Sequence, residues 1–329
     1  MGIKWLLDGH PVYIVSTWLG SRAACIMMYH LLLQTVNTQQ SAGVSRGQLQ
    51  LLQYELDGKD VEKAVNELSQ VASGGSLYVI ADEVIERSHV KIFCDKLLTR
   101  VPHLHLWAAS CLHGDAPTGW QVEYLTRPLR SPPAVVREVE QSDMIYPQFV
   151  VKSYSERGVT DHTDGPPVRL LSHRKQGHSD GQPGDCVTCG REVASFLHSL
   201  RVGVTENVTT ASTTVPFTTG GTPPSCLQWR DVLVLHWGGF SENSGMMNTL
   251  IEAGIPVRVM KDDDVEDVAT ARSDVVWVTD GDSVRGLERK VVVCLDGAYD
   301  SVRLQLYCLS RCTAQLMYIL STTRVVLTD

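Results

Sequence analysis

Hydrophobic and polar positions in the first half of the chain follow two alternating periodicities. Continuous apolar runs rich in β-branched residues, such as 76–81, predict buried strands, whereas 61–72 places apolar side chains at helical spacing. Strands that alternate with helices are typical of a mainly parallel sheet covered on both faces. The pattern predicts strands at 10–17, 48–56, 76–81, 103–109 and 122–126, and helices at 21–34, 61–72 and 84–98.

The second half repeats this alternation, so the sequence predicts a second α/β unit. Residues 204–225 differ: they are Thr-rich and almost free of large apolar side chains, which predicts a disordered insertion. The Pro-rich piece 127–133 suggests a boundary between a domain at 1–126 and a domain at 127–329. We expect strands at 168–172, 231–236, 256–260, 274–279, 290–295, 315–320 and 324–327, and helices at 191–200, 245–253 and 300–312.

Length, net charge, cysteine count and the longest apolar run exclude several classes of protein. A length of 329 residues is typical of two domains, and a net charge of −8 argues against a strongly basic nucleic-acid-binding domain while permitting a local basic groove. Nine cysteines are too few for a disulfide scaffold and cannot all pair, which predicts an intracellular protein, cytoplasmic or nuclear, with free thiols. The longest apolar run, 23–33, is too short to span a bilayer, so we expect no membrane partner.

One predicted strand ends in two acidic residues. The apolar run 77–81 leads directly into Asp82 and Glu83. In P-loop NTPases an Asp at this position holds Mg²⁺ and the Glu polarises the attacking water. The alternative is a solvated strand end with no chemical role.

Two motifs near the C-terminus carry a family resemblance. Asp282-Ser-Val-Arg285-Gly286-Leu-Glu288 precedes one apolar strand, and Leu-Tyr-Cys-Leu-Ser-Arg311-Cys precedes another. Together they resemble motifs V and VI of the superfamily 1, UvrD-like helicases, which are P-loop NTPases. In that family a Ser-x-Lys-Gly-Leu-Glu turn is followed by Tyr-Val-Ala-Leu-Ser/Thr-Arg-Ala, and the order, spacing and strand context agree.

Other segments fit the same resemblance. Residues 12–17 with Ser21-Arg22 resemble motif Ia, Asp82-Glu83 resembles motif II, and Leu-Thr-Arg-Pro-Leu-Arg130-Ser-Pro resembles motif IV. The resemblance implies an α/β fold of two RecA-like parallel-sheet domains. The first would be incomplete, because the strand that leads into the phosphate loop would be missing beside the strand at 103–109.

The resemblance also implies catalytic roles. Asp82 would hold Mg²⁺ and Glu83 would polarise water, while Arg130 and Arg311 would reach the γ-phosphate of ATP as arginine fingers do. A surface salt bridge is the alternative for each arginine.

Binding roles follow from the same motifs. Gly286 and Glu288 would contact the nucleotide, with Glu288 binding the ribose or sensing closure of the cleft. Thr17, Ser21 and Arg22 would contact the backbone of single-stranded nucleic acid.

The chain also departs from the family pattern. It contains no Gly-Lys-Ser/Thr phosphate loop (Walker A), which would be expected upstream of Met1 if the chain is N-terminally truncated. Residues 109–113 lack the Gly-Asp-x-x-Gln of motif III, Arg285 replaces a Lys, and Asp282 replaces a His. We therefore expect a fragment or degenerate paralogue of a helicase-like ATPase, inactive as written and possessing no bound cofactor. The alternative is a non-catalytic interaction or scaffold module with protein partners of unknown identity.

A separate constellation has metal-ligand spacing. Cys186-x-x-Cys189 has the spacing of two zinc ligands, and His173 and His178 precede it within one loop-like stretch. Structural zinc needs four ligands within tetrahedral reach. The alternative interpretation is a polar loop that leads into the helix predicted at 191–200.

Overall fold

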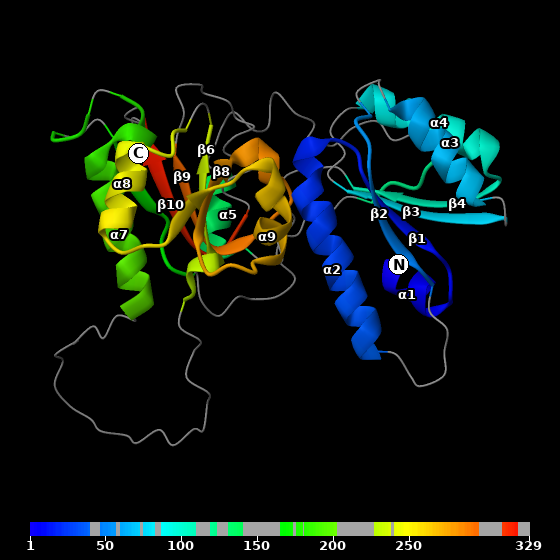
Figure 1. The fold of residues 1–329 in the computed structure, drawn as a ribbon, viewed down its shortest axis with the longest axis horizontal. Coiled ribbons are helices and arrows are strands. Elements are labelled where there is room, and N and C mark those ends of the chain that lie inside the picture. Colours follow the sequence, from blue (N-terminus) through cyan, green and yellow to red (C-terminus); the bar gives the residue numbers. More distant parts are fainter. Residues whose placement is uncertain are drawn as a thin grey trace, which may run out of the picture.

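The computed structural model contains two separate α/β units that lie side by side (Figure 1). Each has one sheet in which every strand pair is parallel. The prediction of two parallel-sheet units is therefore confirmed. The structure describes residues 1–39, 47–56, 60–72, 75–82, 87–109, 119–123, 131–140, 165–173, 176–179, 181–202, 227–237, 240–295 and 311–321.

The first sheet has four strands in the order β2-β1-β3-β4. Its strands are β1 (Val12–Ser16), β2 (Leu49–Gln53), β3 (Ser76–Asp82) and β4 (His103–Ala108). The apolar runs predicted to be strands form its centre, and all five residues of β1 are buried. In the described part of the chain β4 pairs only with β3, and the side chain of Trp107 on this edge strand is 50% exposed. Incompleteness of the first sheet stays a prediction.

Helices cover both faces of the first sheet. Leu6 and Val36, from α1 (Gly2–Leu7) and α2 (Arg22–Gln39), pack with Val12 and Tyr78 on one face. The helices α3 (Val61–Val71) and α4 (Arg87–Arg100) pack on the other face, where Phe93 is almost fully buried. The alternating faces of each strand thus fill two apolar layers.

The second sheet has six strands in the order β5-β10-β9-β6-β8-β7. Their bounds are β5 (Arg169–Ser172), β6 (Val232–His236), β7 (Val257–Val259), β8 (Val276–Asp280), β9 (Arg289–Leu295) and β10 (Cys312–Leu320). The helices α7 (Val187–Val202) and α8 (Gly245–Glu252) pack on one face, and α5 (Pro133–Glu140) and α9 (Val265–Thr270) on the other. The buried run 291–295 of β9 lies at the centre and contributes to both layers.

Some predicted elements differ from the structure. Residues 121–123 form no strand, and Cys312 begins β10 instead of ending a helix. Residues 124–126, 300–310, 324–327 and the Thr-rich 204–225 lie outside the described residues. The short helices α5 and α9 were not predicted. Among the described residues no helix combines the length and apolar character needed to cross a membrane.

Candidate functional site

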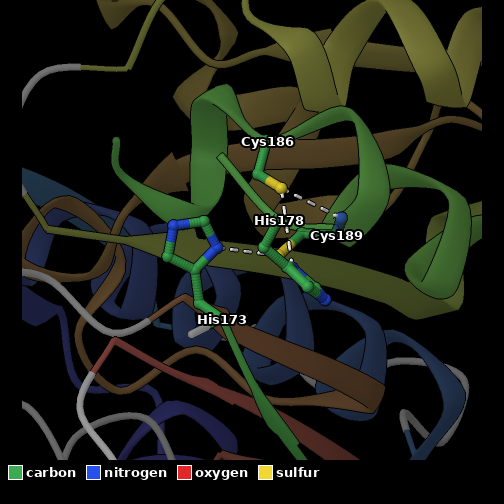
Figure 2. Close-up of side chains that lie close together, drawn as sticks. All are labelled: His173, His178, Cys186 and Cys189. Carbon is green, nitrogen blue, oxygen red and sulfur yellow. Dashed lines mark hydrogen bonds between the residues drawn. The ribbon is translucent and has the colours of Figure 1, made fainter. Parts of the chain in front are cut away.

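Four potential metal ligands converge at one end of the second sheet (Figure 2). His173 directly follows β5, His178 lies in the next loop, and Cys186 ends the 3-10 turn η3 (Pro183–Asp185). Cys189 lies in the first turn of α7. One ligand atom from each side chain lies within 4.8 Å of every other. The structure therefore brings together all four residues that the spacing had grouped.

The distances within this cluster match those between ligands of one tetrahedral ion. The Nδ1 atoms of His173 and His178 each lie 3.3 Å from Sγ of Cys189, and Sγ of Cys186 lies 3.6 Å from Nδ1 of His178. A tetrahedral Zn²⁺ with bonds of about 2.3 Å to sulfur and about 2.0 Å to nitrogen separates such ligands by about 3.5 Å. These three separations lie within about 0.2 Å of that value, and every other pair of ligand atoms lies within 4.8 Å.

The outward-facing nitrogen of each histidine meets an oxygen. Nε2 of His173 lies 2.8 Å from the carbonyl oxygen of Gly181, and Nε2 of His178 lies 3.9 Å from Oε2 of Glu192. A carbonyl only accepts hydrogen bonds, so His173 carries its proton on Nε2 and turns the lone pair of Nδ1 inward. Oxygen partners of this kind orient metal-ligating histidines.

The four side chains of the cluster are buried, which makes it costly to ionise the two thiols. Cys186, Cys189 and His173 are 1%, 0% and 4% exposed, and the side chain of His178 is 4% exposed. Burial raises the pKa of the Cys189 thiol, and the neighbouring Cys186 raises it further. Burial alone would raise the pKa of Cys186, but donors from Cys189 and Ser179 lower it below its ordinary value. Two buried thiolate sulfurs within 4.8 Å of each other repel unless a cation lies between them.

The predicted nucleic-acid-binding residues lie at the junction of the two units. Thr17 and Ser21 are buried, and Arg22 is half-buried at the start of α2. The Ser21 hydroxyl accepts from the backbone N–H of Thr17 at 3.1 Å and donates to the carbonyl of Trp18 at 2.9 Å. It thereby holds the turn η1 (Leu19–Ser21) closed, and the predicted nucleic-acid role of these residues stays a prediction.

The turn η6 (Gly281–Val284), which resembles part of motif V, packs against η1. Asp282 accepts from Nε and Nη2 of Arg285 at 3.1 and 2.5 Å, and the Arg285 guanidinium lies 4.8 Å from the ring centroid of Trp18. A side chain at Gly20 would overlap both the Trp18 ring and the Asp282 backbone, so the close approach requires a glycine there.

Gly286 has a positive φ of 74°, and Glu288 is half-buried. Both lie on the chain between η6 and β9. Their predicted nucleotide contacts stay predictions.

Arg311 is placed by contacts within the second unit. It is 4% exposed, and its Nη1 donates to the carbonyl oxygens of Val284 at 2.5 Å and Leu287 at 3.3 Å. The guanidinium thus ties the residue before β10 to the end of η6 and to the chain that follows η6. Its role as an arginine finger stays a prediction.

The remaining predicted residues are Asp82, Glu83 and Arg130, whose expected roles at Mg²⁺ and at the γ-phosphate stay predictions. Asp82 ends β3 half-buried, in register with Ser16 of β1. Glu83 and Arg130 lie outside the described residues.

Two residues that contribute to the Cys/His cluster and to the junction, Glu192 and Trp18, were not predicted from the sequence. Glu192 stands three residues after Cys189 in α7, a spacing that puts both on one side of a helix and could have identified it. Trp18, by contrast, contacts a residue more than 260 positions away, and no local pattern indicates that contact.

Comparisons with known proteins add little. No family model matches the sequence, and no curated protein matches it. The chain is similar to the helicase domain of Hef from Pyrococcus furiosus, with 96% of this chain and 93% of that one covered. The TM-score is 0.27 and the identity is 8%, so this similarity is weak and distant.

Proposed function

We propose that this chain is a fragment or degenerate paralogue of a superfamily 1 helicase-like ATPase. It would keep two parallel-sheet units and the ability to bind single-stranded nucleic acid, but would not itself turn over ATP. The observation that carries the proposal is the packing of η1 against η6 at the junction of the two units. These turns follow β1 and β8, at the carboxyl ends of parallel strands, where open α/β sheets bind ligands. They also contain the residues that resemble motifs Ia and V.

The lack of turnover follows from what the sequence and the junction supply. The sequence has no Gly-Lys-Ser/Thr loop to cradle the phosphates, and phosphoryl transfer depends on positioning and charge stabilisation. Removing one preorganised donor typically costs about 10²–10³ in rate, so loss of the whole cradle leaves no measurable rate. The hydrogen bonds of Arg311 to two carbonyl oxygens support the same conclusion, because these donors are used within the second unit instead of on a γ-phosphate.

The test is steady-state ATP hydrolysis with Mg²⁺, in the presence and absence of single-stranded DNA or RNA. We expect a background rate for the chain as given and the same rate for Asp82→Asn and Arg311→Ala. A rate stimulated by nucleic acid and abolished by Asp82→Asn would overturn the proposal.

A second candidate function is a non-catalytic interaction module. The observation that favours it is that the junction side chains bond to one another: Asp282 pairs with Arg285, which lies over Trp18. Fluorescence anisotropy with labelled single-stranded DNA and RNA distinguishes the two. Binding weakened by Arg22→Glu, but not by Arg201→Glu on α7, supports the helicase-like module; no binding at any salt concentration favours the interaction module.

A further inference from the structure

We propose that His173, His178, Cys186 and Cys189 bind one structural Zn²⁺ that fastens the edge strand β5 to the helix α7. The site is independent of the helicase resemblance, because its ligands come from a segment that none of the resembling motifs includes. It is also independent of any catalytic activity.

The ligand set selects zinc and a structural role. Two sulfurs and two imidazole nitrogens in tetrahedral reach are the donors of structural zinc sites, whereas calcium and magnesium prefer oxygen. All four positions would be taken by protein atoms, and all four side chains are almost fully buried. A closed site of this kind leaves no position for a substrate or an activated water.

Charge supports the same assignment. Two thiolates neutralise the two positive charges of Zn²⁺, and the two imidazoles bind as neutral ligands. The result is a neutral group in a buried place, which avoids the cost of an uncompensated buried charge. The N–H of Cys189 lies 3.4 Å from Sγ of Cys186 and adds a donor to that sulfur.

The surrounding contacts orient the ligands. The Gly181 carbonyl accepts from Nε2 of His173 and so keeps its Nδ1 inward, and the Glu192 carboxylate faces the outward Nε2 of His178. Oε2 of Glu192 is buried without a hydrogen-bond partner among the described residues, and it faces Nε2 of His178 at 3.9 Å. Thr188 fastens the loop by donating to the carbonyl of Gly177 at 2.7 Å.

The segment needs such a fastening. Between His173 and Cys186 the sequence has no Val, Ile, Leu, Met, Phe, Tyr or Trp, and its one proline, Pro183, is buried. The strand β5 is four residues long and pairs only with β10 in the described part of the chain. Metal coordination supplies the folding free energy that hydrophobic burial cannot supply here.

The first experiment measures zinc in the full chain after gel filtration. We expect one Zn²⁺ per chain, and loss of that zinc in Cys189→Ser. Cys312→Ser is the matched control, because Cys312 is equally buried but lies in β10 away from the cluster. No bound metal after refolding with excess zinc, or unchanged zinc in Cys189→Ser, would overturn the proposal.

The second experiment replaces zinc by Co²⁺ in the unmodified chain, so it does not depend on a variant that folds. We expect the thiolate-to-cobalt charge-transfer band and the intense visible bands of a tetrahedral site. Weak bands typical of octahedral cobalt, or a Cys186–Cys189 disulfide found by mass under non-reducing conditions, would contradict the assignment.

The third experiment tests the positioning role of Glu192 with all four ligands intact. Glu192→Gln should weaken zinc binding by about 10- to 100-fold in competition with a chelator. His198→Ala is the control on the same helix, since His198 contacts the carbonyl of Ala253 and not the cluster, and it should leave the affinity unchanged. Equal zinc affinities in the two variants would show that Glu192 does not position His178 as a zinc ligand.

Discussion

Two arginines of the second unit are buried and bind backbone carbonyls. Arg289 is 9% exposed and donates to the carbonyl of Glu288 at 2.8 Å and to that of Val268. Burial lowers the pKa of Arg289 to about 10, partly offset by Asp231, so the side chain still carries its charge at neutral pH. Arg311 is held in the same way. Such charges are tolerated inside a protein when carbonyl oxygens replace water around the donors.

These contacts give a prediction for Arg311. Arg311→Ala removes the buried side-chain donors to the carbonyls of Val284 and Leu287, although the Val284 carbonyl still accepts from the N–H of Leu287 at 3.1 Å. We expect the free energy of unfolding to fall by about 1–3 kcal/mol, measured by urea denaturation. Arg230→Ala is the control, because Arg230 is an arginine near the surface. An unchanged unfolding midpoint in Arg311→Ala would show that Arg311 does not stabilise the fold and would favour the arginine-finger interpretation.

Asp267 gives a pH-dependent prediction. Partial burial alone would raise its pKa, but the hydroxyl and N–H of Ser273, at 2.5 and 2.8 Å, lower it below its usual range. The pKa of Asp267 is therefore lower in the folded chain than in the unfolded chain, so the ionised carboxylate stabilises the fold. This stabilisation is present above about pH 4, the pKa of an unfolded Asp, and is lost as the pH falls through the lower pKa of the folded chain.

Replacing Asp267 tests this linkage. We expect Asp267→Asn to lower the free energy of unfolding by about 1 kcal/mol at neutral pH. The difference from the original chain should shrink as the pH falls below about 4. Asp262→Asn, at an exposed position of the same region, is the control in urea titrations at both pH values. A difference that stays constant with pH would contradict the assigned cause.

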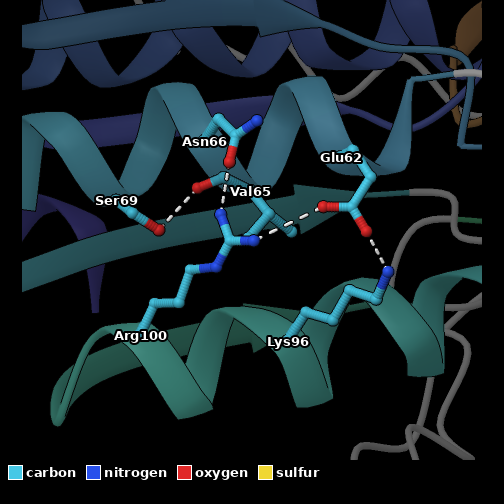
Figure 3. A network of polar contacts seen from close by, with 6 residues as sticks. All are labelled: Glu62, Val65, Asn66, Ser69, Lys96 and Arg100. Atoms are coloured by element: carbon cyan, nitrogen blue, oxygen red, sulfur yellow. Dashed lines mark hydrogen bonds and ion pairs between the residues drawn. The ribbon is translucent and has the colours of Figure 1, made fainter.

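At the scale of elements, polar contacts join α3 to α4 on their solvent side (Figure 3). Glu62 accepts from Lys96 and from Nη2 of Arg100, and Asn66 accepts from Nη1 of Arg100. The hydrogen bond from Lys96 lowers the pKa of Glu62. These side chains are exposed, so water and salt screen the interaction. The apolar layer beneath, which includes Leu97, holds the pair of helices together.

A pair of substitutions separates the two contributions. Leu97→Ala should lower the free energy of unfolding by about 2–5 kcal/mol, because Leu97 is fully buried in that layer. Glu62→Gln should have no measurable effect at physiological salt and a small destabilising effect only at low ionic strength. Urea unfolding monitored by circular dichroism at two salt concentrations measures both. A large, salt-independent loss in Glu62→Gln would show that the surface network matters more than the apolar layer.

The sequence identifies most elements of this fold for a physical reason. The central strands are continuous runs of β-branched residues, and α3 has clear helical spacing, so local pattern and final burial coincide. The helix α9 is six residues long, and its apolar side chains were too few to indicate a period. The Cys-x-x-Cys spacing likewise indicates two ligands, but only the fold brings His173 beside them. The junction contact of Trp18 depends wholly on tertiary packing.

At the scale of the whole molecule, α2 belongs to both units. Val36 near its C-terminal end packs under the first sheet, while Ala23 and Ile26 near its start join the apolar layer of the second unit with Val268. Figure 1 shows α2 standing between the first sheet and α9. His30 adds a contact of 3.7 Å to Glu266. A boundary drawn from composition does not reveal this arrangement, because α2 precedes every segment of the second unit in the sequence.

The shared helix leads to a prediction about cooperativity. Ile26 is 6% exposed and lies in an apolar layer made mostly by the second unit, so its burial couples the unfolding of the two sheets. We expect the original chain to unfold in one transition, with amides of β1 and β9 exchanging at the same global rate. Ile26→Ala should lower the free energy of unfolding by about 2–5 kcal/mol and split these exchange rates, with one sheet opening before the other. Ile251→Ala, the same substitution at a position of α8 that is 55% exposed, should leave both quantities unchanged. If β1 and β9 already exchange independently in the original chain, α2 does not couple the units, and the junction between η1 and η6 is an adjustable contact.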